Sequence, residues 1–399
     1  MIEFAEAQAS LLRLARKVGH ERVALAQADR RVLADDVRAP GDLPPFDYST
    51  MDGYAVAHAD VIAESAMPVI EESRTGLMPS PLAPKSAMRI FTGAPLPIGA
   101  DAVIPQEEAT RAGDDIRFTK APKYGAFLRR RGDDRKAGDV VLRGGVVLGP
   151  AHLALLASVD SPDVAVAKLP RVTVLTTGDE LRDPGSPNVA GTIPDSNGVS
   201  LAAFFARALA DVTLAPRVRD DAAATRAAIE AALFTSDVLV VVGGMSVGDH
   251  DVVRAALGAA GVDIAFWRVA IKPGKPLAVG THPSGAMIVG LPGNPASALV
   301  TGALFVIPLL RAMQGALQPF PSPLRVPLAR DFERDPGRLE FLRATLREGD
   351  GTVDPLTHQA SGAAWNVANA TCLAVMPKEL AHIAQGTLVD VHLFAELGL

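Results

Sequence analysis

The stretch VLVVVGGMSVGDHD, residues 238–251, decides the fold class of this 399-residue chain. Its first five residues form an uninterrupted apolar run, which is typical of a strand buried on both faces of a parallel sheet. Two glycines follow, and a helix is predicted directly after the loop, over residues 252–257. A buried strand, a glycine-rich loop and a helix in this order are typical of an α/β fold.

The same alternation extends in both directions from this stretch. We predict further strands at 172–175, 264–269 and 287–289, and helices at 199–209, 222–233 and 296–310. Because the strands are continuous runs of Val, Ile and Leu, the segment is predicted to form a doubly wound, mostly parallel sheet.

The flanking segments have other patterns. Apolar residues at Leu11, Leu14, Ala15 and Val18 predict an amphipathic helix within residues 2–18. Residues 46–145 indicate short strands and turns, and Pro150 is placed to begin a second helix. After a proline-rich boundary at 319–323, strands are predicted at 325–328, 339–346, 373–376 and 387–393. We therefore expect a β-rich insertion between flanks that pack together, then the α/β domain and a small β domain.

Composition excludes several classes of protein. The net charge of −6 argues against a chain that binds nucleic acid over its whole surface. A single cysteine, Cys372, excludes an internal disulfide framework and fits a reducing cytosol. The apolar segment 296–310 is too short and too interrupted for a membrane span, and the acidic N-terminus is unlike a signal peptide. We expect a multidomain cytosolic protein.

Ligands of open α/β sheets bind beyond the carboxyl ends of the strands, and the predicted loops there are unusual. TTGDE (176–180) carries two carboxylates, which could bind a divalent cation or serve as turn and cap residues. GGMSVGDHD (243–251) could expose backbone N–H groups to an anion, although it matches neither a Walker A loop nor a dinucleotide fingerprint. Asp221 is placed to cap the helix at 222–233, which leaves Asp220 free.

Two proline-rich turns complete this set. In KPGKP (272–276), prolines and a glycine stiffen a turn that carries two lysines, which favours anion binding over a solvated charged turn. In LPGNP (291–295), Asn294 and Pro295 suit a helix start, and a role in binding is equally compatible with the residues.

A basic cluster lies outside the α/β segment. Residues 117–143 hold nine Lys and Arg against three Asp, including Arg129, Arg130 and Arg131. Because no aromatic residues suited to base stacking accompany them, a small polyanion or a salt-bridge network fits better than nucleic acid.

Taken together, the motifs resemble those of one family. FDYSTMDGYAV (46–56), RIFTGAPLPIGADAVIPQEE (89–108), RRRGDD (129–134), TTGDEL (176–181), GGMSVGDHD (243–251), IKPGKP (271–276), LPGNPAS (291–297) and GRLEFLR (337–343) occur in this order. The series resembles the molybdopterin molybdenumtransferases, the family of bacterial MoeA and the E domain of gephyrin, over nearly the whole chain.

The resemblance implies a four-part subunit. It places a helical linking domain at 1–45 and 132–168, with the first helix packed on the 132–168 region. It also places an inserted β-rich domain at 46–131, a molybdopterin-binding α/β domain at 169–318 and a C-terminal β-barrel at 319–399. It implies an elongated cytoplasmic homodimer with a composite active site, formed by the α/β domain of one subunit and the inserted domain of the other. Neither a membrane nor a nucleic acid is an expected partner.

The implied reaction inserts molybdate into the dithiolene of adenylated molybdopterin, with Mg²⁺ assisting and AMP released. The molybdopterin adenylyltransferase that supplies this substrate is a further expected partner. The family pattern assigns catalysis to Asp52, Thr92, Glu180, Asp220, Asp251, Lys272 and Lys275, with Glu180, Asp220 and Asp251 on Mg²⁺. It assigns substrate binding to Asp134, Gly243, Gly244, Ser246, Arg268, Pro292, Gly293, Asn294, Pro295, Arg343 and Ser361. Arg268 stands where many members of the family have Lys. This replacement keeps the positive charge but exchanges a compact ammonium donor for a forked guanidinium.

Two alternatives remain. The preceding adenylylation step shares the TGDE and GG-x-S loops, but a standalone adenylyltransferase would be a single α/β domain. A scaffold like the gephyrin E domain would bind receptor tails, and peptide binding without any pterin ligand would identify it.

Overall fold

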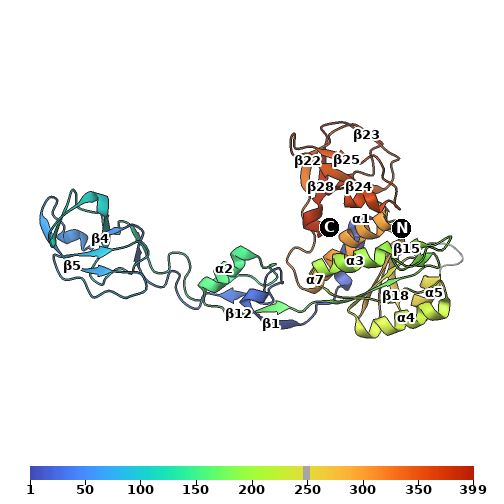
Figure 1. The fold of residues 1–399 in the computed structure, drawn as a ribbon, viewed down its shortest axis with the longest axis horizontal. Coiled ribbons are helices and arrows are strands. Elements are labelled where there is room, and N and C mark those ends of the chain that lie inside the picture. The colour runs from blue at the N-terminus through green and yellow to red at the C-terminus, as the bar shows by residue number, and fades with distance from the viewer. Residues whose placement is uncertain (246–251) are drawn as a thin grey trace.

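The computed structural model describes residues 1–245 and 252–399. Figure 1 shows an elongated molecule with a β-rich lobe at one end, a small connecting segment, and two adjoining lobes at the other end. The predicted fold class is confirmed: a doubly wound α/β domain, an inserted β-rich domain, an N-terminal helical segment and a C-terminal β domain are all present.

The α/β sheet has six strands in the order β16-β13-β17-β21-β20-β18. Their bounds are Asp211–Leu214 (β16), Arg171–Thr176 (β13), Val238–Val242 (β17), Met287–Leu291 (β21), Ala278–Thr281 (β20) and Asp263–Trp267 (β18). The first four are parallel, whereas β20 runs antiparallel to both β21 and β18. The sequence analysis missed β20, a four-residue strand that contains Gly280.

Helices cover both faces of this sheet, as the apolar strands require. One face packs against α3 (Ser196–Arg207) and a long helix made of α6 (Pro295–Thr301), the π-helical turn η4 (Gly302–Val306) and α7 (Ile307–Met313). The other face packs against α4 (Ala222–Thr235) and α5 (Val252–Ala259). The helix Pro295–Met313 is long and apolar enough to cross a membrane, but 83% of its most apolar window is buried, as in a core helix.

The first helix, α1 (Phe4–Leu14), packs elsewhere than expected. Ala7 and Leu11 are fully buried in the α/β core, and the Phe4 ring contacts Phe305 and Phe341 at centroid distances of 5.7 and 5.1 Å. The expectation that it packs on the 132–168 region therefore differs from the structure. The physical reason is that the apolar stripe of α1 finds aromatic partners beside α7 and the C-terminal sheet.

The two flanks of the insertion do pack together from residue 20 onward. β1 (His20–Ala24) pairs with β12 (Asp163–Ala167), and β2 (Val37–Arg38) pairs with β11 (Val140–Leu142). α2 (Pro150–Ser158) buries Leu156 in their common core. This connecting segment leads from the α/β lobe to the inserted lobe (Figure 1).

The inserted lobe has its own sheet and core. The strand order is β7-β4-β6-β5-β9-β8, with bounds Ala102–Pro105 (β7), Gly53–Val56 (β4), Ala87–Ile90 (β6), Ala66–Ser73 (β5), Asp115–Phe118 (β9) and Ala109–Ala112 (β8). A separate pair joins β3 (Tyr48–Ser49) to β10 (Leu128–Arg129). Three-residue 3-10 turns lie at Leu25–Gln27, His58–Asp60 and Gln106–Glu108.

The C-terminal lobe is a half-barrel sheet of order β19-β24-β26-β28-β22, with β25 paired to β24. The bounds are Ile271–Lys272 (β19), Leu339–Leu346 (β24), Cys372–Met376 (β26), Leu388–Leu393 (β28), Leu324–Pro327 (β22) and Val353–Pro355 (β25). Short elements complete the fold: β14 (Leu181–Arg182), β15 (Ile193–Pro194), β23 (Phe332–Glu333), β27 (His382–Ile383), α8 (Ala364–Ala368) and α9 (Phe394–Leu397). Because β19 comes from the α/β segment, one strand joins these two lobes.

Candidate functional site

The carboxyl edge of the α/β sheet gathers the loops that the sequence analysis singled out. β13, β16, β17 and β21 are parallel, so the loops that follow them begin at one edge. β18 is antiparallel to β20, as β21 is, so the turn that carries Lys272 and Lys275 begins at this edge too. The turn connects two antiparallel strands, and it follows the strand that the sequence predicts at 264–269.

The glycines after β17 allow a close approach between loops. Gly243 has φ of +95°, and a Cβ there would lie 2.5 Å from the Thr177 carbonyl oxygen. A Cβ on Gly244 would lie 2.2 Å from Val253 Cγ2, and Gly293 lies against the Gly243 Cα. The loops after β13, β17 and β21 thus pack backbone to backbone, which leaves no room for side chains at Gly243 and Gly244. Ser246 and Asp251 lie outside the described residues.

A further polar group at this edge was missed by the sequence analysis. Asp195 caps α3 by accepting from the Gly198 N–H at 2.9 Å, and it also accepts from Thr176 Oγ1 at 2.7 Å. Asn197 donates from Nδ2 to the Gly293 carbonyl at 2.6 Å. The buried Thr177 Oγ1 and Asn197 Oδ1 have no hydrogen-bond partner among the described residues. The signal in the sequence was the D-S-N-G helix start at 195–198, which places an Asp at the N-cap.

Two acidic loops lie side by side at this edge. The Gly178 N–H donates to the Val218 carbonyl at 3.1 Å, and Asp179 forms an ion pair with Arg219 at 3.0 Å. The Arg219 guanidinium holds the pKa of Asp179 below its ordinary value. Glu180 and Asp220 are exposed, and neither carboxylate has a hydrogen-bond or ion-pair partner within 1–245 and 252–399. Among the described residues, the two loops thus carry one carboxylate in an ion pair (Asp179), one that caps α4 (Asp221), and two without a side-chain partner (Glu180 and Asp220).

The two lysines of the proline-rich turn differ in their contacts. Lys272 Nζ lies 2.8 Å from Glu340 Oε1 of the half-barrel sheet, whereas the exposed Lys275 has no side-chain partner in the described part of the chain. Gly274 has φ of +106°, and a Cβ there would lie 2.2 Å from Thr301 Cγ2 of α6. Arg268, half-buried, has φ of +74° and donates its backbone N–H to the Leu277 carbonyl at 2.9 Å.

The start of α6 is held by the C-terminal lobe. Asn294 occupies the N-cap position, but its Nδ2 donates to Ser361 Oγ at 3.0 Å and its side chain does not cap the helix. The Ala296 N–H donates to the Ser361 carbonyl at 3.0 Å. Pro292 is buried, Gly293 and Asn294 are exposed, and Pro295 is the first helical residue. The Ala296 N–H of this helix start is therefore satisfied within the chain, whereas Gly293 and Asn294 remain exposed.

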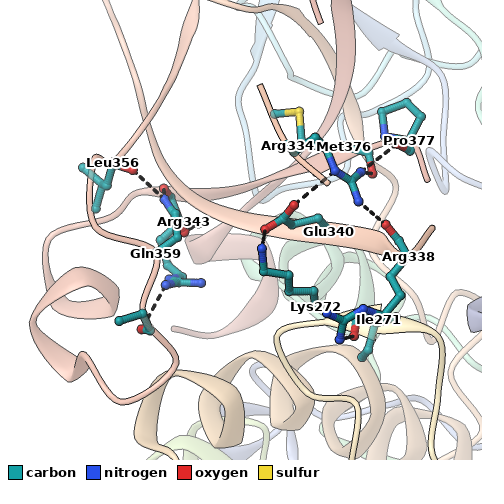
Figure 2. A network of polar contacts seen from close by, with 11 residues as sticks. Ile271, Lys272, Arg334, Arg338, Glu340, Arg343, Leu356, Gln359, Met376 and Pro377 are labelled. Carbon is teal, nitrogen blue, oxygen red and sulfur yellow. Dashed lines mark hydrogen bonds and ion pairs between the residues drawn. The ribbon is translucent and has the colours of Figure 1, made fainter. Parts of the chain in front are cut away.

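Arg343 lies beneath the loop that carries Ser361. Its residue is 1% exposed, and Nη2 donates to the Ala360 carbonyl at 3.2 Å. Gln359 bonds both the N–H and the carbonyl of Arg343, at 3.1 and 2.9 Å (Figure 2). Burial lowers the pKa of the Arg343 guanidinium, and the charge of Glu340 opposes that effect. Within one chain, Arg343 thus supports the loop that carries Ser361 through its hydrogen bonds to Ala360 and Gln359.

The remaining predicted residues lie in the inserted lobe or next to it. Asp52 Oδ1 accepts from both the N–H and the Oγ1 of Thr92, each at 2.8 Å, and these bonds lower the pKa of Asp52. Asp134 forms an ion pair with Arg129. Asp52 and Thr92 flank β4 and β6, at the opposite end of the molecule from the α/β sheet (Figure 1). Within one chain, the structure does not bring Asp52 and Thr92 to those candidate residues of the α/β sheet that it describes.

The basic cluster is partly neutralised by ion pairs. Arg129, Arg130 and Arg131 pair with Asp134, Asp47 and Asp42 respectively. Of the two interpretations left open by the sequence, the salt-bridge network is the one observed for these three arginines.

Comparisons with known proteins cover nearly the whole chain. Three family models match in order: "MoeA N-terminal region (domain I and II)" at residues 2–159, "Probable molybdopterin binding domain" at 173–312, and "MoeA C-terminal region (domain IV)" at 325–394. Molybdopterin molybdenumtransferase 2 of Mycobacterium tuberculosis is 37% identical over 92% of this chain and 94% of its own length. The molybdopterin molybdenumtransferase of Haemophilus influenzae is 36% identical over 94% of both chains.

Solved structures give the same result. A crystal structure of a molybdopterin biosynthesis MoeA protein from Pyrococcus horikoshii OT3 superposes with a TM-score of 0.86 and 27% identity. The match covers 98% of this chain and 100% of that one. The order of all four parts is therefore shared with proteins whose names refer to molybdopterin.

Proposed function

Because the chain belongs to the molybdopterin molybdenumtransferase family, we propose that it inserts molybdate into the dithiolene of adenylated molybdopterin and releases AMP. This is the last common step of molybdenum cofactor biosynthesis. The observation that carries the proposal is the set of loops at the carboxyl edge of the α/β sheet. These loops carry lysines, closely packed glycines, and carboxylates that have no partner among residues 1–245 and 252–399. In the reaction water cleaves the phosphoanhydride bond, so that AMP leaves and the molybdopterin keeps its phosphate. The two dithiolene sulfurs replace oxygen ligands of the molybdenum, which stays hexavalent, and the displaced oxygen leaves as water with the protons of the thiols.

The substrates are anionic, so the site must supply preorganised positive charge and N–H donors. Lys272 and Lys275 would contact the molybdate or the phosphates, Lys272 from a position set by Glu340. Gly244, Gly293 and Asn294 would donate from the backbone, and Pro292 and Pro295 stiffen the last two. The Gly243 N–H already donates to the Leu291 carbonyl at 3.2 Å, so Gly243 would serve the site by allowing the close approach of the loops. Arg268, Ser246, Ser361, Arg343 and Asp134 are further binding residues in this proposal.

The acidic residues suit a magnesium ion. Within residues 1–245 and 252–399 no group of three or more His, Cys, Asp or Glu side chains could hold a metal ion. Glu180 and Asp220 nevertheless offer carboxylate oxygens that have no partner in the described part of the chain, and carboxylate oxygens are the ligands that Mg²⁺ prefers. Together with Asp251 they would hold Mg²⁺, which when bound supplies Lewis-acid neutralisation of the phosphoanhydride charge.

The active site is proposed to be completed by a second subunit. Asp52 and Thr92 are hydrogen-bonded to each other, and Asp52 directly precedes β4. β4 lies in the inserted lobe, at the opposite end of the molecule from the α/β lobe that carries Glu180 (Figure 1). A homodimer that places the inserted lobe of one subunit against the α/β lobe of its partner would bring them together. We propose that the reaction takes place in the cytoplasm. The partner that supplies the substrate would be the molybdopterin adenylyltransferase.

The test is AMP release from adenylated molybdopterin with Mg²⁺, with and without molybdate. Molybdate-dependent release is expected. Tight molybdopterin binding without release would favour a carrier or scaffold, and no binding would overturn the proposed function.

A further inference from the structure

A buried carboxylate of the C-terminal lobe lies directly against a lysine of the candidate site. The Glu340 side chain is 4% exposed and stands between two cations. Its Oε1 lies 2.8 Å from Lys272 Nζ, and its Oε2 lies 3.2 Å from Arg334 Nε (Figure 2). The sequence analysis quoted Glu340 within GRLEFLR but assigned it no role.

Arg334 is fixed independently of Glu340. Its side chain is 2% exposed, and Nη1 donates to the carbonyls of Met376 and Pro377 at 3.0 and 2.7 Å. Nη2 donates to the Arg338 carbonyl (Figure 2). The three carbonyls hold the Arg334 guanidinium in place, and its charge faces one side of the Glu340 carboxylate while the other side faces Lys272. The contact with Arg334 is an ion pair and not a hydrogen bond, since Arg334 Nε and Glu340 Oε2 have no hydrogen-bond partner among the described residues.

The backbone reinforces this arrangement. β19 pairs with β24 in parallel register, with Ile271 opposite Leu339 and Lys272 opposite Glu340. Lys272 is therefore anchored at its Cα by the sheet and at its ammonium by Glu340. The side chain remains 46% exposed, and an ammonium has three N–H donors, so donors remain for an anion.

We propose that Glu340 is a positioning residue for Lys272, an inference that rests on the role proposed above for Lys272. The lysine side chain is flexible, and Glu340 orders its ammonium before substrate binds. Lys275, three residues away, lacks such a carboxylate partner in the described part of the chain. Glu340 of the half-barrel sheet thereby contributes to the reaction although its carboxylate does not contact the substrate.

The experiment is a double-mutant cycle in the full-length protein, with molybdate-dependent AMP release as readout. For Glu340→Gln we expect kcat/KM for molybdate to fall about 10- to 100-fold, because a displaced ammonium no longer faces the anion. In the Lys272→Met background, Glu340→Gln should change the rate by less than about twofold, since the two residues act as one unit. Asp390→Asn, which removes the exposed ion pair with Arg325 in the same sheet, is the matched control and should behave like wild type.

A purely structural role would be to neutralise Arg334. The double variant Arg334→Met/Glu340→Gln removes both buried charges together, so no unpaired ion is left in the interior. It takes the place of Glu340→Gln in the experiment if the single variant fails to fold. We expect its Tm to recover while kcat/KM stays low. Recovery of kcat/KM as well would overturn the positioning role, as would a wild-type-like Glu340→Gln or an equal loss in both Lys272 backgrounds.

Failure of the proposed function has a different signature. A wild-type chain without molybdate-dependent AMP release would contradict the transferase reaction, and a fully active Lys272→Met variant would remove Lys272 from it. A strongly impaired Lys272→Met together with an unaffected Glu340→Gln would refute only the inference about Glu340.

Discussion

Asn294 Nδ2 donates a hydrogen bond to Ser361 Oγ at 3.0 Å, and this contact joins the start of α6 to the C-terminal lobe. The Ser361 carbonyl accepts the Ala296 N–H at the same place. The candidate site is thus built by two lobes of one chain, and Ser361 acts on it through the loop geometry as well as through its hydroxyl.

Replacement of Ser361 by Ala should separate these two contributions. The backbone bond remains, so the free energy of unfolding should fall by about 1 kcal/mol or less. We expect kcat/KM to fall about tenfold or more, because the Asn294 side chain loses its partner at the edge of the site. Thermal unfolding and AMP-release kinetics check this, with Ser322→Ala in the exposed linker as control. A wild-type rate would remove the Ser361 hydroxyl from the site.

Glu180→Gln should abolish turnover, with a loss of at least about 100-fold, while Tm and dimer mass remain unchanged. The reason is that the Glu180 carboxylate is exposed and has no partner in the described residues, so it contributes little to folding but supplies charge for a cation. The same result is expected for Asp251→Asn. Asp183→Asn, which removes an exposed ion pair with Arg217, is the control. Full activity of Glu180→Gln would contradict its assignment.

Mixed dimers test the composite site. Asp52→Ala and Glu180→Ala subunits, each inactive alone, should regain activity when refolded or exchanged together, because a heterodimer retains one intact site. With random mixing the regained activity should approach about a quarter of the wild-type value. Mass spectrometry must confirm the heterodimer; its formation without any activity would argue against a site shared between subunits.

Thr92→Val should raise the pKa of Asp52 toward its ordinary value of 3.8. The Thr92 N–H and then its hydroxyl lower that pKa in the folded protein, and the substitution removes the hydroxyl. Because the pKa of the folded state is the depressed one, the interaction is present above pH 3.8 and is lost as pH falls through the folded-state pKa. NMR titration of the Asp52 carboxyl is the measurement; an unchanged titration midpoint would mean that the Thr92 hydroxyl does not act on Asp52.

Replacement of Gly243 and of Gly258 by Ala should change the free energy of unfolding in opposite directions. Gly243 has φ of +95° and a Cβ there would lie 2.5 Å from the Thr177 carbonyl oxygen, so Gly243→Ala should lower the free energy of unfolding by about 1–3 kcal/mol. Gly258 is helical with no atom within 4 Å of an added Cβ, so Gly258→Ala should stabilise by about 0.5–1 kcal/mol. Denaturant unfolding compares them, and equal effects would refute the steric argument.

Local sequence was sufficient wherever the cause of the structure is local. The apolar run Val238–Val242 predicted a strand buried on both faces, and it is the third strand of the α/β sheet. The position of Asn294 before Pro295 predicted the start of a helix. The short strand β20 was missed because four residues that include Gly280 carry little periodic signal.

What the sequence by itself determined was therefore the α/β class, the β-rich segments around it and the loops that carry charge, since apolar periodicity and turn residues act over a few positions. Only the tertiary structure decided which partner each of these residues has. In the folded protein the Asn294 side chain donates to Ser361 and does not cap its own helix. Glu340 lies against Lys272, and α1 packs on Phe305 and Phe341. These contacts join residues that are 67 or more positions apart, and such pairings follow from how the lobes pack, which no local pattern of residues encodes.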